Sequence, residues 1–199
     1  VGLTGDMTNM ETMFAVKNLF QKTLNYSYLD SRAKHTYINF KNRSNYLFNS
    51  GIEGIEESDL ILLIGTNPRF EATILNSRIR KTYLKNKTEI FSLEDVGDLT
   101  YPYKVLENNS KVINKIIKNE HDLSNKIASA EKPIIILGQS ILNSKNGAYI
   151  FEELKKYLTS INKIDDNWNS LNILSSDASA VGSYDLGIFS SNDGSNKTL

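Results

Sequence analysis

Four consecutive residues, Gly65-Thr66-Asn67-Pro68, have types that could hold a phosphate group or a nucleotide. They follow five aliphatic residues from Leu60 to Ile64, a run whose length is typical of a strand buried on both faces. Gly65 can adopt a positive φ, Asn67-Pro68 favours a turn, and a helical pattern begins at Glu71. In an open α/β sheet, such a loop would lie at the carboxyl edge of the strands, where ligands usually bind.

The chemistry of this loop alone is a weak signal, because most joints between a strand and a helix bind no ligand. The loop has one glycine, whereas a dinucleotide fingerprint has three, and it lacks the Gly-Lys-Ser/Thr ending of a P-loop. The next helix has Ile74, Leu75 and Ile79 at helical spacing, with Arg78 and Arg80 on its outer or C-terminal side. The residues alone therefore leave both a ligand site and an ordinary structural joint open.

Strands and helices alternate along the chain, which predicts an α/β fold with a parallel sheet and helices on both faces. A second buried strand is expected at 133–138 and a more peripheral strand at 88–93. Amphipathic patterns predict helices over 71–84 and 146–163 and a helix capped by Thr8 or Asn9. This first helix is expected to contribute core residues, namely Met10, Met13, Phe14, Leu19 and Phe20. The segment 168–187 is expected to be irregular.

The 199 residues suffice for one α/β domain over 1–199, with residues 1–45 as a possible part of an adjoining lobe and 188–199 as a loose tail. The residues after Val1 look like the inside of a fold, so we expect a piece of a longer chain. Aromatic and basic residues interleave between 25 and 49, a pattern that can bind single-stranded nucleic acid. Because the whole chain is electrically neutral, packed loop aromatics are the favoured interpretation.

The charge and cysteine content exclude several classes of function. Lysine plus arginine and aspartate plus glutamate number 23 each, so no net charge favours nucleic acid or an anionic membrane. The absence of cysteine excludes disulfides, thiolate-bound iron–sulfur clusters and cysteine zinc sites in this stretch. The histidines, His35 and His121, lie far apart and outside any metal-ligand motif. No apolar run approaches the ~20 residues that span a bilayer, so no direct membrane insertion is expected.

Several ordered stretches together resemble one family. They are Gly5-Asp6 with Glu11 and Lys17, Asp30 and Arg32, Tyr46 with Phe48-Asn49-Ser50, Ile55 to Asp59, Gly65 to Arg69 with Glu71-Ala72, Asn76 with Arg78 to Lys81, Asp98 to Tyr101, Trp168-Asn169 with Leu174, and Asp185 to Gly187. This set resembles the C-terminal part of the large iron–sulfur subunit of respiratory complex I, the NADH-quinone oxidoreductase. That part is in turn similar to molybdopterin oxidoreductases.

The resemblance implies a non-catalytic structural lobe that carries no cofactor of its own. Iron–sulfur clusters would belong to modules upstream of Val1, and the partners would be other subunits of the peripheral arm. The implied location is peripheral, on the cytoplasmic face of the bacterial inner membrane or the mitochondrial matrix side. Arg69, Glu71, Arg78 and Arg80 would be structural or interface residues. Thr73 departs from the usual proline, a tolerable change at the start of a helix.

Two alternatives stay open. The chain could belong to an active molybdopterin oxidoreductase, in which Gly65, Thr66, Asn67 and Pro68 would contact the guanine-dinucleotide arm of the cofactor. It could also resemble the nucleotide-binding middle domain of thiamine-diphosphate enzymes, because the stretch from Lys132 to Gly138 has that character. The second alternative predicts binding of FAD or NAD.

Overall fold

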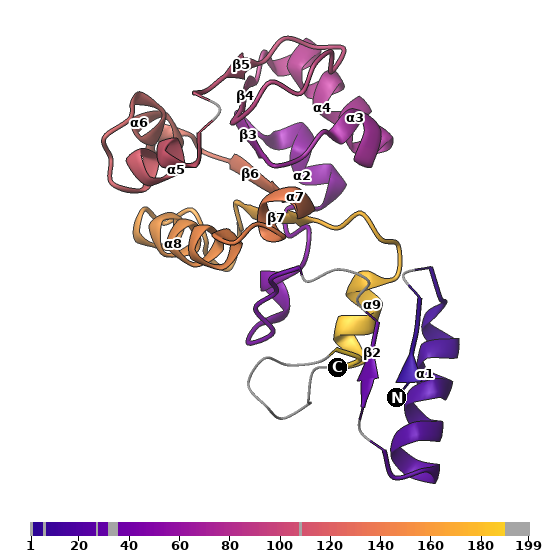
Figure 1. Ribbon diagram of the computed structural model, residues 1–199. Coiled ribbons are helices and arrows are strands. Elements are labelled where there is room, and N and C mark those ends of the chain that lie inside the picture. The colour runs from indigo at the N-terminus through magenta and orange to yellow at the C-terminus, as the bar shows by residue number, and fades with distance from the viewer. Residues whose placement is uncertain (1, 6, 27, 32–35, 108, 190–199) are drawn as a thin grey trace. The chain divides into compact units, whose positions relative to one another are not determined.

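The computed structural model describes residues 2–5, 7–26, 28–31, 36–107 and 109–189 (Figure 1). The chain divides into two compact units. Unit 1 comprises Val1–Arg43 with Asp177–Leu199, and unit 2 comprises Ser44–Ser176. The expectations for Val1, Arg32 and His35 and for the last ten residues of the tail fall outside the described residues.

Unit 2 contains the loop with the candidate site, and it alternates helices and strands as the sequence pattern predicts. Its elements are η2 (Arg43–Asn45, beginning one residue before the unit), α2 (Gly51–Glu57), β3 (Leu60–Ile64), α3 (Pro68–Glu71), α4 (Thr73–Asn86), β4 (Glu89–Ser92), β5 (Lys104–Val105), α5 (Ser110–Ile117), α6 (Asp122–Ser129), β6 (Pro133–Gly138), α7 (Gln139–Leu142), α8 (Gly147–Ser160) and β7 (Leu171–Leu174).

The five strands of unit 2 form one sheet in the order β5-β4-β3-β6-β7, and every neighbouring pair is parallel. From β3 the chain moves to one side through β4 and β5, and then crosses back to β6 and β7 on the other side. The direction of winding therefore reverses between β3 and β6, which is where open α/β sheets commonly bind their ligands. Figure 1 shows α2, α3 and α4 on one side of the sheet and α5, α6 and α8 on the other, so the predicted fold class is confirmed.

The two central strands are apolar along their whole length because both of their faces are covered. All residues of β3 and β6 are buried. On one face Ile61 and Leu63 pack with Ile136 of β6 and with Ile55 and Ile79, which come from α2 and α4. This continuous burial explains why the strands read as unbroken apolar runs without a polar alternation.

The helix expected from residue 71 is interrupted. Pro68–Glu71 forms a short helix, α3, and Thr73 is the first residue of α4. Ala72 lies between them with φ −152° and ψ 72°, outside the helical region. As a result Ile74 is exposed, although its spacing suggested the buried face, whereas Leu75 and Ile79 are buried.

The prediction that the segment 168–187 is irregular is wrong. It contains β7, a strand of the central sheet, and α9 (Ala180–Asp185). The expected peripheral strand, β4, lies between β3 and the short edge strand β5. The long amphipathic helix α8 ends at Ser160, earlier than expected, and Asn162 adopts a left-handed conformation with φ 56°.

Unit 1 pairs β1 (Gly2–Leu3) with β2 (Leu29–Asp30) in parallel, and also contains α1 (Met10–Asn18), the π-helix η1 (Leu19–Thr23) and α9. Asn9 caps α1 as predicted, since its side-chain oxygen accepts from the amide of Thr12 at 2.9 Å. The expected core is only partly correct. Met13 is buried and Phe20 packs beside it, whereas three of the five predicted residues are exposed, namely Met10, Phe14 and Leu19.

The aromatic residues between 25 and 49 are not packed uniformly. Tyr46 is buried, and Phe48 packs against the core of unit 2. Tyr26 and Tyr28 are exposed. The interpretation of this stretch as packed loop aromatics therefore holds for the residues of unit 2 and is wrong for these two tyrosines.

Candidate functional site

The loop after β3 begins with a left-handed glycine and ends in a helix cap. Gly65 has φ 63°, as the sequence predicted. Asn67 caps α3, because its side-chain oxygen accepts from the amide of Arg69 at 3.1 Å, and Pro68 occupies the first helical position. Thr66 and Pro68 are buried. The four residues expected from the sequence thus form the tight turn that they were expected to form.

The carboxylate of Glu71 turns back and engages the polar groups of this loop. One of its oxygens accepts from the Thr66 hydroxyl at 2.9 Å, and the other accepts from the backbone amide of Asn67 at 2.8 Å. A hydroxyl and a free amide at a helix start are the donors that a phosphate group would use. In this chain both donors are already bound to an anion, which is the chain's own side chain.

The switch point between β3 and β6 is closed by direct contact. The Ser140 hydroxyl donates to the carbonyl of Gly65 at 2.6 Å. A Cβ atom built on Gly138 would lie 2.1 Å from that same carbonyl oxygen, and a Cβ on Gly65 would lie 2.8 Å from the amide nitrogen of Ile141. The two chain segments therefore touch at the position where a ligand would enter between the strands.

A second loop, between β4 and β5, is fastened to the first by polar contacts. The side-chain amide of Asn67 donates to the carbonyl of Val96 at 2.8 Å. Arg69 donates to the carbonyl of Asp98 at 2.6 Å and to its carboxylate at 2.7 Å. The amide of Thr100 and the Arg69 guanidinium lower the pKa of Asp98. Since the carboxylate of Asp98 is largely exposed, this ion pair contributes position more than free energy.

A buried pair anchors the same loop to α4. The Tyr101 hydroxyl donates to the side-chain oxygen of Asn76 at 2.7 Å, and the Asn76 amide donates to the carbonyl of Leu99 at 3.0 Å. All three residues are buried. Burial, with a smaller contribution from Tyr103, raises the pKa of Tyr101. Both polar side chains are satisfied, so the pair can stabilise the loop without leaving an unpaired group in the core.

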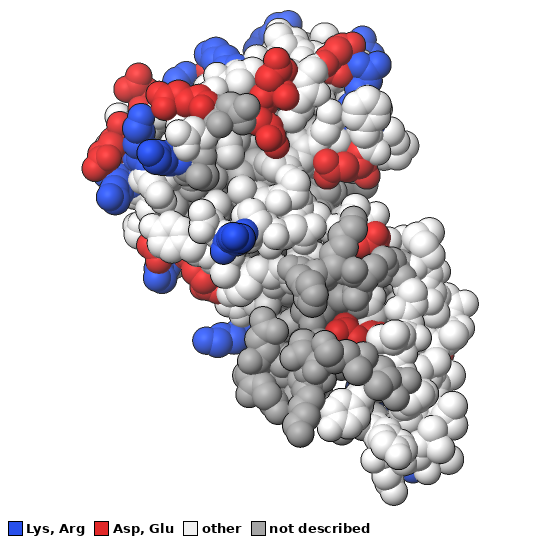
Figure 2. Space-filling model, viewed as in Figure 1, with Lys and Arg blue, Asp and Glu red and all other residues white. Residues whose placement is uncertain are grey.

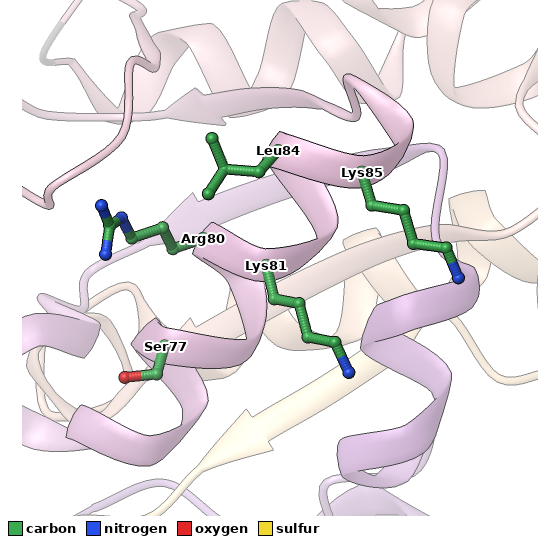
Figure 3. A pocket seen from close by; sticks show the side chains of 5 residues that line it. All are labelled: Ser77, Arg80, Lys81, Leu84 and Lys85. Carbon is green, nitrogen blue, oxygen red and sulfur yellow. The ribbon is translucent and has the colours of Figure 1, made fainter.

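The two arginines of α4 have different surroundings. Arg78 forms an ion pair with Glu56 of α2, and Lys81 donates to both oxygens of that carboxylate at 2.9 and 2.8 Å. Lys81, and then Arg78, lower the pKa of Glu56. Arg80 is exposed and lines a shallow surface pocket with Ser77 and Leu84, together with Lys81 and Lys85 (Figure 3). Figure 3 shows the guanidinium of Arg80 directed away from the two lysine amines, so the cations do not converge on one point.

The described residues give no metal site or membrane span. They contain no group of three or more His, Asp, Glu or Cys side chains that could hold a metal ion. His121 caps α6, because its Nδ1 atom accepts from the amide of Leu123 at 3.0 Å. Within the described part of the chain, no helix combines the length and the apolar character that crossing a membrane requires.

The sequence placed Arg69 and Glu71 correctly beside the loop, but their partners were not predicted. Asp98 and Glu56 belonged to stretches that resembled the family, and no role had been assigned to them. Tyr101 was expected in a loop, and its buried contact with Asn76 was not foreseen. A carboxylate three or four residues after a helix cap is a known local signal, and it could have identified Glu71 as the group that closes the turn.

The molybdopterin oxidoreductase family model matches residues 1–198. The chain belongs to this family. Among curated proteins, the chain is 36% identical over 200 residues to the NADH-ubiquinone oxidoreductase 75 kDa subunit of Reclinomonas americana, which covers 94% of this chain and 29% of the relative. It is 35% identical to the mitochondrial 78 kDa subunit of Neurospora crassa, covering 93% of this chain and 25% of the relative. It is 33% identical to an NADH-quinone oxidoreductase subunit of Rickettsia bellii, covering 92% and 27%.

These names confirm the resemblance to the large subunit of complex I that the ordered stretches indicated. The chain spans between a quarter and 29% of the length of these relatives. Within the molybdopterin oxidoreductase family, the strand, loop and helix around Gly65 therefore keep the framework of a ligand loop. Glu71 and the contact between Gly65 and Gly138 fill that framework from within.

Proposed function

We propose that this chain is a non-catalytic structural lobe of the large iron–sulfur subunit of NADH-quinone oxidoreductase, and that it supports electron transfer from NADH to quinone without taking part in the chemistry. The observation that carries the proposal is the position of Glu71, whose carboxylate holds the Thr66 hydroxyl and the Asn67 amide. A cofactor phosphate at this loop would have to displace that carboxylate or lie against its negative charge, which costs free energy in either case.

The names of the relatives support the same proposal, since all three describe subunits of an NADH oxidoreductase complex. We therefore propose that the chain acts within a proton-translocating enzyme complex, with other subunits of its peripheral arm as partners. In this proposal the complex is membrane-associated, and this lobe is peripheral to it on the cytoplasmic side in bacteria or the matrix side in mitochondria. No cofactor would bind this lobe, and the iron–sulfur clusters would belong to other parts of the longer subunit.

Each of the four charged residues has a structural role in this proposal. Glu71 closes the loop after β3, and Arg69 fastens the neighbouring loop through Asp98. Arg78 joins α4 to α2 through Glu56. Arg80 is exposed beside the surface pocket, and it is the residue of the four whose position suits contact with a neighbouring lobe or subunit.

An active molybdopterin enzyme is the alternative, in which Gly65, Thr66, Asn67 and Pro68 would contact a guanine dinucleotide. The two functions can be separated by Glu71→Ala in the intact complex, with Glu53→Ala, an exposed carboxylate of α2, as the control. A structural role predicts that less complex assembles while NADH:quinone turnover per assembled complex stays at the wild-type value. A fall in turnover per assembled complex with normal assembly would contradict the proposal.

A further inference from the structure

The described part of unit 1 has a small hydrophobic core. The cluster around Met13 contains two further buried residues, Leu29 and Ile188, with Val16 and Phe20 packed against it. Met13 is the single buried residue of the nine in α1. An independent domain normally encloses a core that is much larger than this. Unit 1 thus lacks much of the apolar packing that would hold it together.

The outer face of α1 is apolar where a solvent-exposed helix is normally polar. Met10 and Phe14 lie four residues apart, hence on one face, and they are 46% and 52% exposed. Met7, in the turn before the helix, is 79% exposed. Figure 2 shows the part of unit 1 around α1 as almost free of charged side chains, in contrast to the intermingled charges on unit 2. An uncharged face of this kind marks an interface.

The small sheet of unit 1 is also incomplete by the rules for parallel sheets. β1 and β2 pair over two residues each, with no third strand in the part of the chain that the structure describes. One face is covered, since a Cβ atom on Gly2 would lie 3.2 Å from the ring of Phe20. Leu3, whose side chain points to the opposite face, is 69% exposed. Parallel strands occur in larger sheets with cover on both faces, and a two-stranded sheet is marginal in water.

We propose that further polypeptide of the same longer chain completes unit 1, by adding to the β1–β2 sheet and by covering Leu3 and the α1 face formed by Met7, Met10 and Phe14. This inference rests on the proposed function, in which the chain is one lobe of a much longer subunit. The relatives supply the length, because the chain spans 25% to 29% of each. The apolar character of the surface fits a permanent interface, since transient interfaces between separate proteins are more polar.

The test uses the intact subunit within its complex, with a photo-activated cross-linking amino acid placed at Leu3 or at Phe14. Lys118, an exposed position after α5, serves as the control for non-specific reaction. After illumination, mass spectrometry of the digested product identifies the captured peptides. We expect positions 3 and 14 to capture peptides of the same polypeptide from outside residues 1–199, and position 118 to give none of those products.

Two further measurements keep the result unambiguous. Mixing isotopically heavy and light subunits distinguishes capture within one polypeptide from capture of a second copy, because the second would yield mixed-mass products. Capture of a second copy, of another subunit or of lipid, or reaction with water alone, would overturn the proposal. Co-purification of the other NADH oxidoreductase subunits is scored separately, so the proposed function can fail while the same-chain cross-links still appear.

Discussion

The carboxylate of Glu71 accepts a hydrogen bond from the Thr66 hydroxyl at 2.9 Å, five residues earlier in the chain. This contact, together with the bond from the Asn67 amide, turns a framework typical of a ligand loop into a closed structural turn. The charge that the loop would offer to a cofactor is thereby neutralised by the protein. The local stability of the loop should therefore depend on Glu71 and on the contacts that support it.

Replacing Glu71 should open the loop locally. Glu71→Ala removes the acceptor for the Asn67 amide, so we expect its hydrogen exchange in the intact subunit to accelerate about tenfold, which corresponds to about 1.4 kcal/mol. Glu71→Gln keeps one acceptor oxygen and should show a smaller effect. Unchanged exchange at Asn67 in the alanine variant would mean that the carboxylate does not hold the loop.

The Asn76–Tyr101 pair should be the stronger anchor, because it is buried. Tyr101→Phe leaves the side-chain oxygen of Asn76 without its donor, with an expected loss of about 1–3 kcal/mol of local stability. The loss would be measured by hydrogen exchange of residues 95–103. Tyr83→Phe, which alters a partly buried tyrosine on the same helix, is the control and should leave this exchange unchanged.

The pH dependence of this anchor has a definite sign. Burial raises the folded-state pKa of Tyr101 above the unfolded value, so the neutral phenol is favoured by folding. Its stabilising contribution is therefore complete below about pH 10, the ordinary tyrosine value, and is lost as the pH rises toward the folded pKa. The stability difference between wild type and Tyr101→Phe should narrow above about pH 10. A difference that widens there would contradict the assignment.

Arg78 and Arg80 should behave differently although they are two residues apart. Arg78→Ala removes one partner of Glu56, so we expect faster exchange in α2 and α4 at low salt and little change at high salt. Arg80→Ala should leave that exchange unchanged and instead reduce the amount of assembled complex. Equal effects of both substitutions on exchange would show that Arg80 also has a role within the lobe.

Ion pairing lowers the pKa of Glu56, and this also sets a pH window. The contribution of the pair is present above the ordinary glutamate pKa and is lost as the pH falls through the lowered folded value. The difference between wild type and Arg78→Ala should accordingly shrink in acid. Exchange of α2 measured at neutral pH and near pH 4 checks this direction.

The contact between the ends of β3 and β6 should not tolerate a side chain. Gly138→Ala would place a methyl group 2.1 Å from the Gly65 carbonyl oxygen, so the backbone must move, at a cost of about 1–3 kcal/mol or more. Gly182→Ala is the matched control, because its nearest contact, with Met10, is an ordinary 3.6 Å. Thermal unfolding of the intact subunit should show a lower midpoint for the first variant alone.

The sequence was most informative where a physical constraint is local. β3 and β6 could be predicted because burial on both faces requires an unbroken apolar run. β7 was missed because Asn172 interrupts its apolar residues. That asparagine is fully buried, and it accepts from the amide and hydroxyl of Ser50 at 2.9 and 3.0 Å, a partner 122 residues away that no local pattern reveals.

The candidate site shows the same division. The turn at Gly65 and the structural character of Arg69 and Glu71 could be expected from turn chemistry and from the family resemblance. The partners Asp98 and Ser140 lie 29 residues from Arg69 and 75 residues from Gly65. Their contacts depend on how the strands are ordered in the sheet, and that order is set by packing over the whole unit.

The central claim, that the ligand loop is closed and unused, is tested most directly by the metal and pterin content of the purified intact complex. Elemental analysis per subunit, with iron measured in the same sample, gives the stoichiometry. We predict no stoichiometric molybdenum or tungsten and no pterin dinucleotide, in wild type and in Glu71→Gln alike. One molybdenum or tungsten atom per subunit, accompanied by a guanine dinucleotide, would contradict the account.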